Sequence, residues 1–286
     1  MSNTPSIPKS HHFVPQMHAR RFTDASGRFW LHNKKAGKSY SSSPKQAFCE
    51  THLYTKEDAA GAKDTSLETW FSGLEGNANT LIEKVVAAIR AGETPSISDQ
   101  ERETWDRYFY MLWKRTPDAL AKVPTLQQAD AHLTKLFADF AALGPELAAE
   151  VAKLDTPEQR SRLVQGSKVG AIERVPGDVL EAFSDKGVVI LRITDPDLHF
   201  VIGSLPVARM AGNLKDQETE VWLPIASDIA MGYAGATGPI KVIELASADE
   251  VAKLNGVIAG QSSSFASASK STIDGLVSAL LDQKTE

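Results

Sequence analysis

The chain contains very little cysteine and no long apolar run. Of its 286 residues only Cys49 is a cysteine, so an internal disulfide is excluded. No apolar stretch approaches the roughly 20 residues that a membrane-spanning helix needs. The opening residues, MSNTPSIPKSHHF, lack the apolar core of a secretory signal. We therefore expect a protein of the reducing cytoplasm that has no membrane segment.

Positive charge is concentrated at the start of a chain that is acidic overall. The net charge is −5, yet residues 1–52 carry eight basic and two acidic side chains, so that segment is +6 and the remaining 234 residues are −11. Five of the seven histidines lie in the same segment. A local positive field attracts phosphates and other anions, but the same face could instead dock on the protein's own acidic body. The sequence leaves both interpretations open.

The order of the predicted elements indicates an α+β fold. Residues 1–10 are expected to form a flexible arm, and residues 28–42 are typical of a β-hairpin. Ser43-Pro44 is predicted to begin a short helix that runs to Thr51. Further helices are predicted over residues 65–71, 77–91, 98–113, 118–141, 145–153, 157–166, 247–259 and 273–281, and strands over 187–192, 199–202, 221–223 and 240–243.

These elements predict one α+β domain over residues 11–286. Its first part, residues 11–56, is a basic element rich in histidine and arginine that contains the hairpin. Residues 64–172 form a helical middle. Residues 185–286 form a small, mostly antiparallel C-terminal sheet flanked by helices.

Four segments carry a resemblance to a known family: HHFVPQMHARRF (11–22), WKRTP (113–117), HFVIGSLPV (199–207) followed by VWLPIASDIAMGY (221–233), and VAKLNGVIAGQ (251–261). On these motifs the chain resembles the bacterial domain-of-unknown-function family 4238, whose members open with His-His-x-Val-Pro-Gln and an Arg-Arg-Phe ending. Where that family usually has Ser-Asp-x-Pro, this chain has Ser204-Leu205-Pro206, so the expected aspartate is missing. The resemblance implies a fold pattern more firmly than a reaction.

The opening motif also resembles the first motif of His-Asn-His endonucleases, in which a hairpin and a helix clasp one divalent metal ion. That resemblance implies catalytic roles for His11, His12 and Asn33, with His12 as a general base because imidazole titrates near working pH. Cys49 and His52 are three residues apart on the predicted short helix and are candidate metal ligands. The cofactor would be one Mg²⁺, Mn²⁺ or Zn²⁺ ion.

Three arginines are candidates for binding phosphate or another anion. Arg20 and Arg21 would hold a phosphate by bidentate contacts. Arg115 either meets a carboxylate or completes an anion pocket with His11. The function would then be a metal-dependent phosphodiester hydrolase, a nuclease, acting on nucleic acid or another phosphate-bearing ligand.

The alternative is a non-catalytic protein that binds an anion or a partner, in which the imidazoles and guanidiniums are structural. Asn255 is costly in the middle of a helix, which predicts a buried hydrogen bond, with the backbone of the N-terminal motif as a candidate partner. Trp105, Tyr108 and Trp113 are expected in the core rather than on a base-stacking surface. A defence or toxin/immunity role belongs to this alternative, and the arm and the hydrophobic tail helix leave room for a homodimer.

Overall fold

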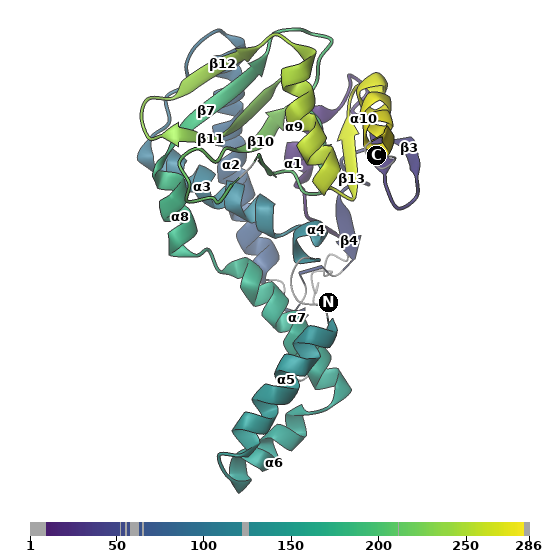
Figure 1. Ribbon diagram of the computed structural model, residues 1–286, viewed down its shortest axis with the longest axis vertical. Helices are drawn as coiled ribbons and strands as arrows, with labels where there is room; N and C mark the ends of the chain where they lie inside the picture. Colours follow the sequence, from purple (N-terminus) through teal and green to yellow (C-terminus); the bar gives the residue numbers. More distant parts are fainter. Residues whose placement is uncertain are drawn as a thin grey trace, which may run out of the picture.

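A computed structural model describes residues 10–282, apart from residues 52, 55, 58–62, 65, 122–125 and 211. It confirms the α+β class, with helices in the middle of the chain and a mixed sheet toward the C-terminus. Figure 1 shows a body of sheets and flanking helices from which a set of helices projects. The flexible arm predicted for residues 1–10 lies outside the described residues except for its last position.

A five-stranded sheet forms the centre of the body. Its order is β12-β7-β11-β10-β9, and every pair is antiparallel except β12 with β7. Val188 and Ile190 of β7 enter one apolar cluster, whereas Val189 and Leu191 enter another. Both faces of β7 are therefore buried, which explains its continuous apolar sequence. The strands are β7 (Lys186–Ile193), β9 (Ala208–Arg209), β10 (Val221–Ala226), β11 (Ile229–Ala236) and β12 (Lys241–Leu245).

Helices cover one face of this sheet: α2 (Ser66–Arg90), α3 (Asp99–Lys114) and α8 (Gly177–Ser184). α2 is continuous where two helices were predicted. α3 begins at the predicted capping box, in which the Glu101 carboxylate accepts from Ser98 N at 2.8 Å and Ser98 Oγ accepts from Glu101 N at 3.3 Å. Phe183 of α8 stacks on Tyr233 of β11 with ring centroids 4.6 Å apart, which fixes α8 on the sheet.

The opposite face is covered by α9 (Ala248–Gln261) and a second sheet of order β3-β2-β13-β8. Its strands are β2 (Phe29–Asn33), β3 (Lys38–Ser42), β8 (Ile202–Gly203) and β13 (Ser264–Ser267). The predicted hairpin is present as β2 and β3. β13 forms in a serine-rich segment that was not predicted as a strand, because β2 and β8 pair with it on both sides. α10 (Lys270–Asp282) packs on this sheet.

The N-terminal motif forms three short elements: β1 (Ser10–His12), α1 (Gln16–Ala19) and the 3₁₀ helix η1 (Arg20–Phe22). β1 pairs antiparallel with β4 (Cys49–Thr51). The helix predicted from Lys45 to Thr51 is therefore wrong. The chain makes one turn after Ser43, Phe48 then takes a φ of 54°, and the next residues join β1. Two further short strands, β5 (Lys56–Glu57) and β6 (Lys63–Asp64), pair with each other.

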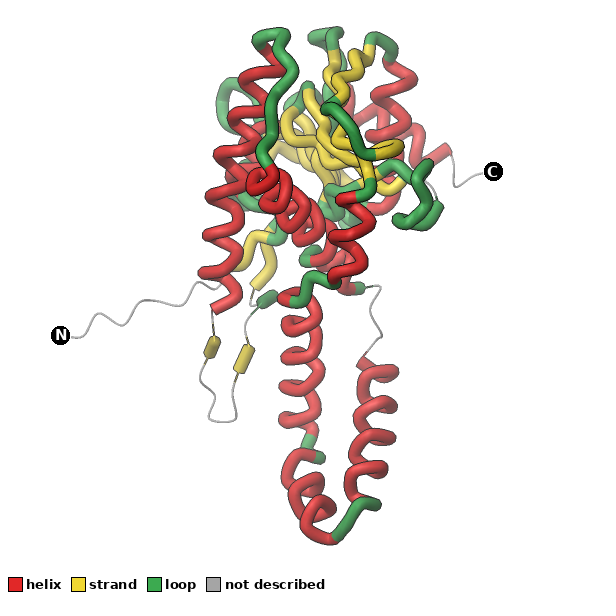
Figure 2. The backbone as a smooth tube through the Cα atoms, turned by 90° about the vertical axis from the view of Figure 1, so that its left-hand side faces the viewer, coloured by secondary structure: helices red, strands yellow, loops and turns green. Residues whose placement is uncertain are grey.

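Three helices build what we call the helical projection, residues 126–166. After α4 (Pro117–Leu120), the chain forms α5 (Leu126–Ala141), α6 (Pro145–Leu154) and α7 (Pro157–Glu173). Figure 2 shows α5 leaving the body, α6 at the far tip and α7 returning alongside α5. Among the described helices, none has the length and apolar character needed to cross a bilayer.

Candidate functional site

His11 is buried at the start of the N-terminal motif. Its Nδ1 lies 2.9 Å from Oε1 of Glu68 on α2 and 3.2 Å from the backbone N of Tyr54. The ring also lies 5.7 Å from the ring of Tyr54. Since His11 is only 1% exposed, the nitrogen that faces this carboxylate is engaged inside the protein.

Arg115 is equally buried and belongs to the same network. Its Nη1 lies 2.8 Å from Oε1 of Glu75, its Nε donates to the carbonyl of Phe13 at 3.0 Å, and its guanidinium lies 4.6 Å from the ring centroid of Phe71. Tyr54 joins the two motif residues, because its hydroxyl donates to the carbonyl of Arg115 at 2.7 Å. Burial alone would lower the pKa of Arg115, but the Glu75 carboxylate raises it.

The structure therefore brings His11 and Arg115 together under two carboxylates of α2. Glu68 and Glu75 are 28% and 27% exposed and lie over side chains that are almost fully buried. Arg115 was expected either to meet a carboxylate or to complete an anion pocket with His11, and its contact with Glu75 matches the first of these. This arrangement holds the first strand, α2 and the end of α3 together.

His18 is a buried residue whose role the sequence did not reveal. Its Nδ1 lies 2.9 Å from the hydroxyl of Tyr108 on α3, and its Nε2 lies 2.8 Å from the carbonyl of Pro224 on β10. Burial lowers the pKa of His18 to about 3. The neutral ring can accept from the tyrosine through Nδ1 and donate to the carbonyl through Nε2, so it links the motif to the core.

His12 and Cys49 face each other across the β1–β4 pair. They are directly opposite partners in the antiparallel register, so their side chains lie on the same face. His12 Nε2 lies 3.2 Å from the carbonyl of Lys45, and Cys49 Sγ lies 3.7 Å from the carbonyl of Gln46. His52, the other predicted ligand, lies outside the described residues. No group of three or more potential metal-binding side chains occurs in the part of the chain that the structure describes.

The remaining arginine candidates do not converge on this network. Arg20 is exposed on η1. Arg21 donates to the carbonyl of Met17 at 2.6 Å and to Oδ1 of Asn79 at 2.9 Å, and lies 3.6 Å from Glu83. Burial lowers the pKa of Arg21. Arg21 thus fastens η1 to α2 at a different point from His11.

The side chains of Asn33 and Asn255 form hydrogen bonds with backbone groups. Oδ1 of Asn33 accepts from Ala36 N at 2.9 Å and shapes the hairpin turn. Asn255 is buried, accepts from Val201 N at 2.9 Å and donates to the carbonyl of His199 at 2.8 Å. The expected hydrogen bonds of Asn255 are therefore present, but its partner is the segment before β8 and not the N-terminal motif.

A carboxylate is present where the expected aspartate is missing. Asp118 of α4 accepts from the hydroxyl of Ser204, and from Ser263 N and Oγ at 2.9 and 3.2 Å. A residue 86 positions away thus supplies the negative charge beside Ser204, which sequence spacing does not reveal.

The helical projection exposes an unusual amount of apolar surface. Among the residues that the structure describes, ten large hydrophobic side chains are exposed, and six of them lie there: Leu136, Phe140, Leu143, Leu147, Leu154 and Leu163. The most exposed is Leu143, at 70%. Between residues 126 and 166, only Phe137 and Val164 are buried among the described large apolar side chains.

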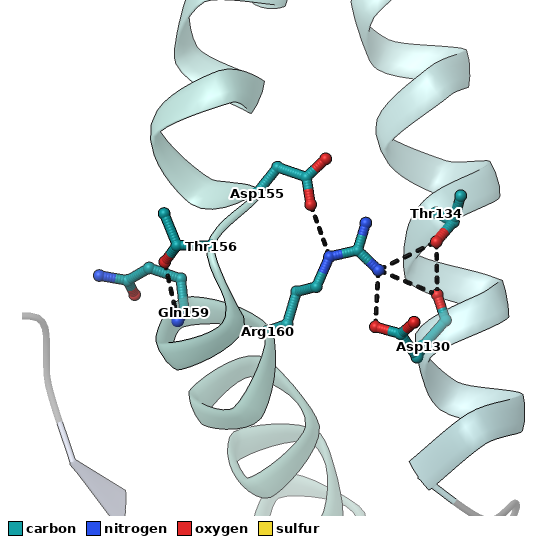
Figure 3. Close-up of polar contacts among 6 residues, drawn as sticks. All are labelled: Asp130, Thr134, Asp155, Thr156, Gln159 and Arg160. Carbon is teal, nitrogen blue, oxygen red and sulfur yellow. Dashed lines mark hydrogen bonds and ion pairs between the residues drawn. The ribbon is translucent and has the colours of Figure 1, made fainter.

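A polar hub holds α5 and α7 together (Figure 3). Arg160 donates from Nε to Asp155 at 2.5 Å and from Nη1 to Asp130 at 2.6 Å and to Thr134 at 2.9 Å. Its guanidinium lies 5.5 Å from the ring centroid of Phe137. The hydrogen bond to Asp155, followed by that to Asp130, raises the pKa of Arg160, so the side chain stays charged and ties the two helices together.

Comparison with known proteins identifies the family but no activity. No curated protein and no solved structure matches the chain. The model of the family described as "Protein of unknown function (DUF4238)" matches residues 10–272. The matched range contains the N-terminal motif, the buried network around His11 and Arg115, and the whole projection, and the chain belongs to this family.

Proposed function

We propose that the protein is a non-catalytic binding protein that acts through its helical projection, and that the partner on this surface is a second copy of the chain. The observation that carries the proposal is a row of apolar side chains on α5 and the turn that follows it. Ala129, Leu133, Leu136, Phe140 and Leu143 follow one another at spacings of four, three, four and three residues. This is the spacing by which helices pack as coiled coils. We call this row the α5 stripe.

Three residues of the α5 stripe, Ala129, Leu133 and Leu136, line an open apolar groove between α5 and α7. The charged, hydrogen-bonding and ring contacts of α5 with Arg160 of α7 are made by Asp130, Thr134 and Phe137, none of which belongs to the stripe. Leu136, at the centre of the stripe, is 47% exposed and lines an apolar groove with Leu163 of α7. α5 thus has a second apolar face, and an amphipathic element is stable when such a face is covered.

A second copy is the occupant that fits this surface. Two identical stripes of this spacing are complementary, because each side chain of one helix fits between those of the other. Residues 126–166 carry six acidic and four basic side chains, a net charge of −2, so two projections repel each other only weakly. α5 has 16 residues and is about 24 Å long, enough for a contact of two helical hairpins.

The projection also places this contact where two bodies do not obstruct it. α5 runs away from the body to the tip (Figures 1 and 2). The buried side chains of His11, His18 and Arg115 hold the body together and carry no part of the contact.

Sedimentation velocity over a concentration series tests the proposal. We expect the unmodified chain to form dimers and Leu136→Glu to be monomeric, because the substitution places a charge at the centre of the contact. Ala138→Glu is the matched control: it adds the same charge to an exposed position of the same helix outside the stripe. A monomeric unmodified chain, or a dimer that survives Leu136→Glu, would contradict the proposal.

A metal-dependent phosphodiester hydrolase is the second candidate, supported by the juxtaposition of His12 and Cys49. Both are partly exposed, and an imidazole and a thiolate on one face suit a transition metal. Exposed Arg20 is available for a phosphate. One experiment compares the metal content of the unmodified chain with that of Cys49→Ala. A second compares the cleavage of plasmid DNA and RNA, in the presence of Mg²⁺, Mn²⁺ or Zn²⁺, by the unmodified chain and by His12→Ala. Metal bound by the unmodified chain, together with cleavage that is lost in His12→Ala, supports the hydrolase. If neither the unmodified chain nor His12→Ala cleaves DNA or RNA, the hydrolase is excluded.

A further inference from the structure

A small cavity at the end of α3 combines aromatic and cationic side chains. It has a volume of about 330 Å³ and is lined by Tyr110, Trp113, Lys114, Leu205, Arg209 and Leu214, among others. This size lies within the range of small-molecule sites, ~300 to 1,000 Å³. We call this cavity the α3 pocket. It lies in the body, and its argument is independent of the projection.

The aromatic wall comes from the outward face of α3. Tyr110, Trp113 and Lys114 have the three- and four-residue spacing that places side chains on one face of a helix. Tyr108 and Phe109 on the other side are buried in the core. Trp113 was expected in the core but is only partly buried and lines the pocket. A ring bound there would have two aromatic side chains beside it.

The charged side chains of the pocket wall are both cations, in a chain with a net charge of −5. Lys114 donates to the carbonyl of Arg174 at 2.8 Å and lies 5.2 Å from the ring centroid of Tyr110. Burial, and then the charge of Arg174, lowers the pKa of Lys114. A bound anion would offset the charge of Arg174 and stabilise the charged form of Lys114.

Arg209 is the cation that is available to a ligand. It is exposed at the end of β9, and within the described ranges no ion pair involves it. Burial, and then the carboxylate of Asp178, raises the pKa of Tyr110, and Asp178 itself lies 3.7 Å from Lys215. Arg209 therefore keeps its full set of guanidinium donors for an anion.

The geometry points to a binding site for a nucleoside monophosphate, a ligand in which one planar base is joined to one anionic group. The base would stack on Trp113 and Tyr110, since every base presents a π-face to an aromatic side chain. The phosphate would lie between Arg209 and Lys114, where charge-assisted hydrogen bonds form. Leu205 and Leu214 add apolar side chains to the pocket wall.

The test is a calorimetric titration of the full chain with AMP, UMP, adenosine and inorganic phosphate. We expect saturable binding of the two nucleotides, and binding at least about tenfold weaker for adenosine and for phosphate alone, because each lacks one half of the ligand. Saturation by phosphate alone with equal affinity would show an anion site without base recognition and would overturn the assignment. So would the absence of saturable binding by either nucleotide.

Two variants with matched controls locate the site. Arg209→Gln changes an exposed side chain and should weaken nucleotide binding about tenfold, while Arg107→Gln, which changes an exposed arginine elsewhere on α3, should leave it unchanged. Trp113→Leu should weaken it similarly, with partly exposed Trp70→Leu as its control. Thermal unfolding of each variant verifies that it is folded. Equal binding by the pocket variants and their controls would place the ligand elsewhere.

Discussion

Nδ1 of His18 lies 2.9 Å from the hydroxyl of Tyr108, a residue 90 positions later in the chain. The other ring nitrogen lies 2.8 Å from the carbonyl of Pro224. One imidazole of the N-terminal motif thus bridges a helix and a strand of the core. This role accounts for one of the five histidines in the opening segment.

The burial of the His18 ring predicts that the protein loses folding stability at acid pH. His18 has a pKa of about 3 in the folded chain and 6.5 when exposed, so the unfolded chain binds the extra proton between these values. The contribution of neutral His18 to the free energy of unfolding is complete above pH 6.5. It is lost as the pH falls toward 3, by up to about 1.4 kcal/mol per pH unit.

Urea unfolding at a series of pH values measures this dependence. His18→Gln should be less stable at neutral pH and should lose less stability on acidification to about pH 5, above the range in which most carboxylates titrate. His132→Gln, at an exposed histidine of α5, should keep the acid dependence of the unmodified chain. Equal slopes for all three proteins would show that His18 is not buried in its neutral form.

Glu75→Ala should destabilise the body because it leaves the buried Arg115 guanidinium without its carboxylate. Breaking a buried pair from one side costs about 3–5 kcal/mol, and the partial exposure of Glu75 places the expected loss near the lower end. Glu103→Ala removes an exposed partner of Arg107 and should cost less than about 1 kcal/mol. Similar losses in the free energy of unfolding would mean that Arg115 is not a buried, paired cation.

Asn255→Ala should cost about 1–3 kcal/mol of unfolding free energy, because it leaves the N–H of Val201 and the carbonyl of His199 without their partner. Gly256→Ala on the same helix meets open space and should be neutral or slightly stabilising. Denaturant unfolding of the two variants compares them directly. A loss in Gly256→Ala as large as that in Asn255→Ala would indicate a general sensitivity of α9.

The sequence predicts well those parts of the fold that local signals determine. The capping box at Ser98 starts α3, and Gly37, with a φ of 63°, lies in the hairpin turn between β2 and β3. Both features depend on residues a few positions apart. The α+β class follows because such local elements give the order of helices and strands.

Elements and contacts that depend on distant partners were missed. The residues around Cys49 contain helix signals, but pairing with β1, some 40 positions earlier, makes them a strand. Ser264–Ser267 has weak strand propensity and becomes β13 between β2 and β8. In the same way, the proximity of His11 and Arg115 depends on a fold that joins residues about 100 positions apart.

Arg160→Gln should loosen the projection and leave the body intact. The substitution removes the charged contact with Asp130, which connects α7 to α5, and the contact with Asp155 at the end of α6. We expect faster hydrogen–deuterium exchange in α5 and α6, with unchanged exchange in β7 and β11. Lys153→Gln, which changes an exposed pair within α6, serves as the control. Unchanged exchange throughout the projection in Arg160→Gln would show that the contacts of Arg160 do not hold α5 and α7 together.

Site-specific cross-linking tests the central claim most directly. Leu136 is the middle residue of the α5 stripe, so two stripes paired in register bring the two Leu136 positions together whether the helices run parallel or antiparallel. In a Cys49→Ser background, Leu136→Cys should form a disulfide-linked dimer on mild oxidation, and Ala138→Cys on the same helix should not become disulfide-linked. Failure of Leu136→Cys to cross-link, or equal cross-linking of the two variants, would contradict self-association through the α5 stripe.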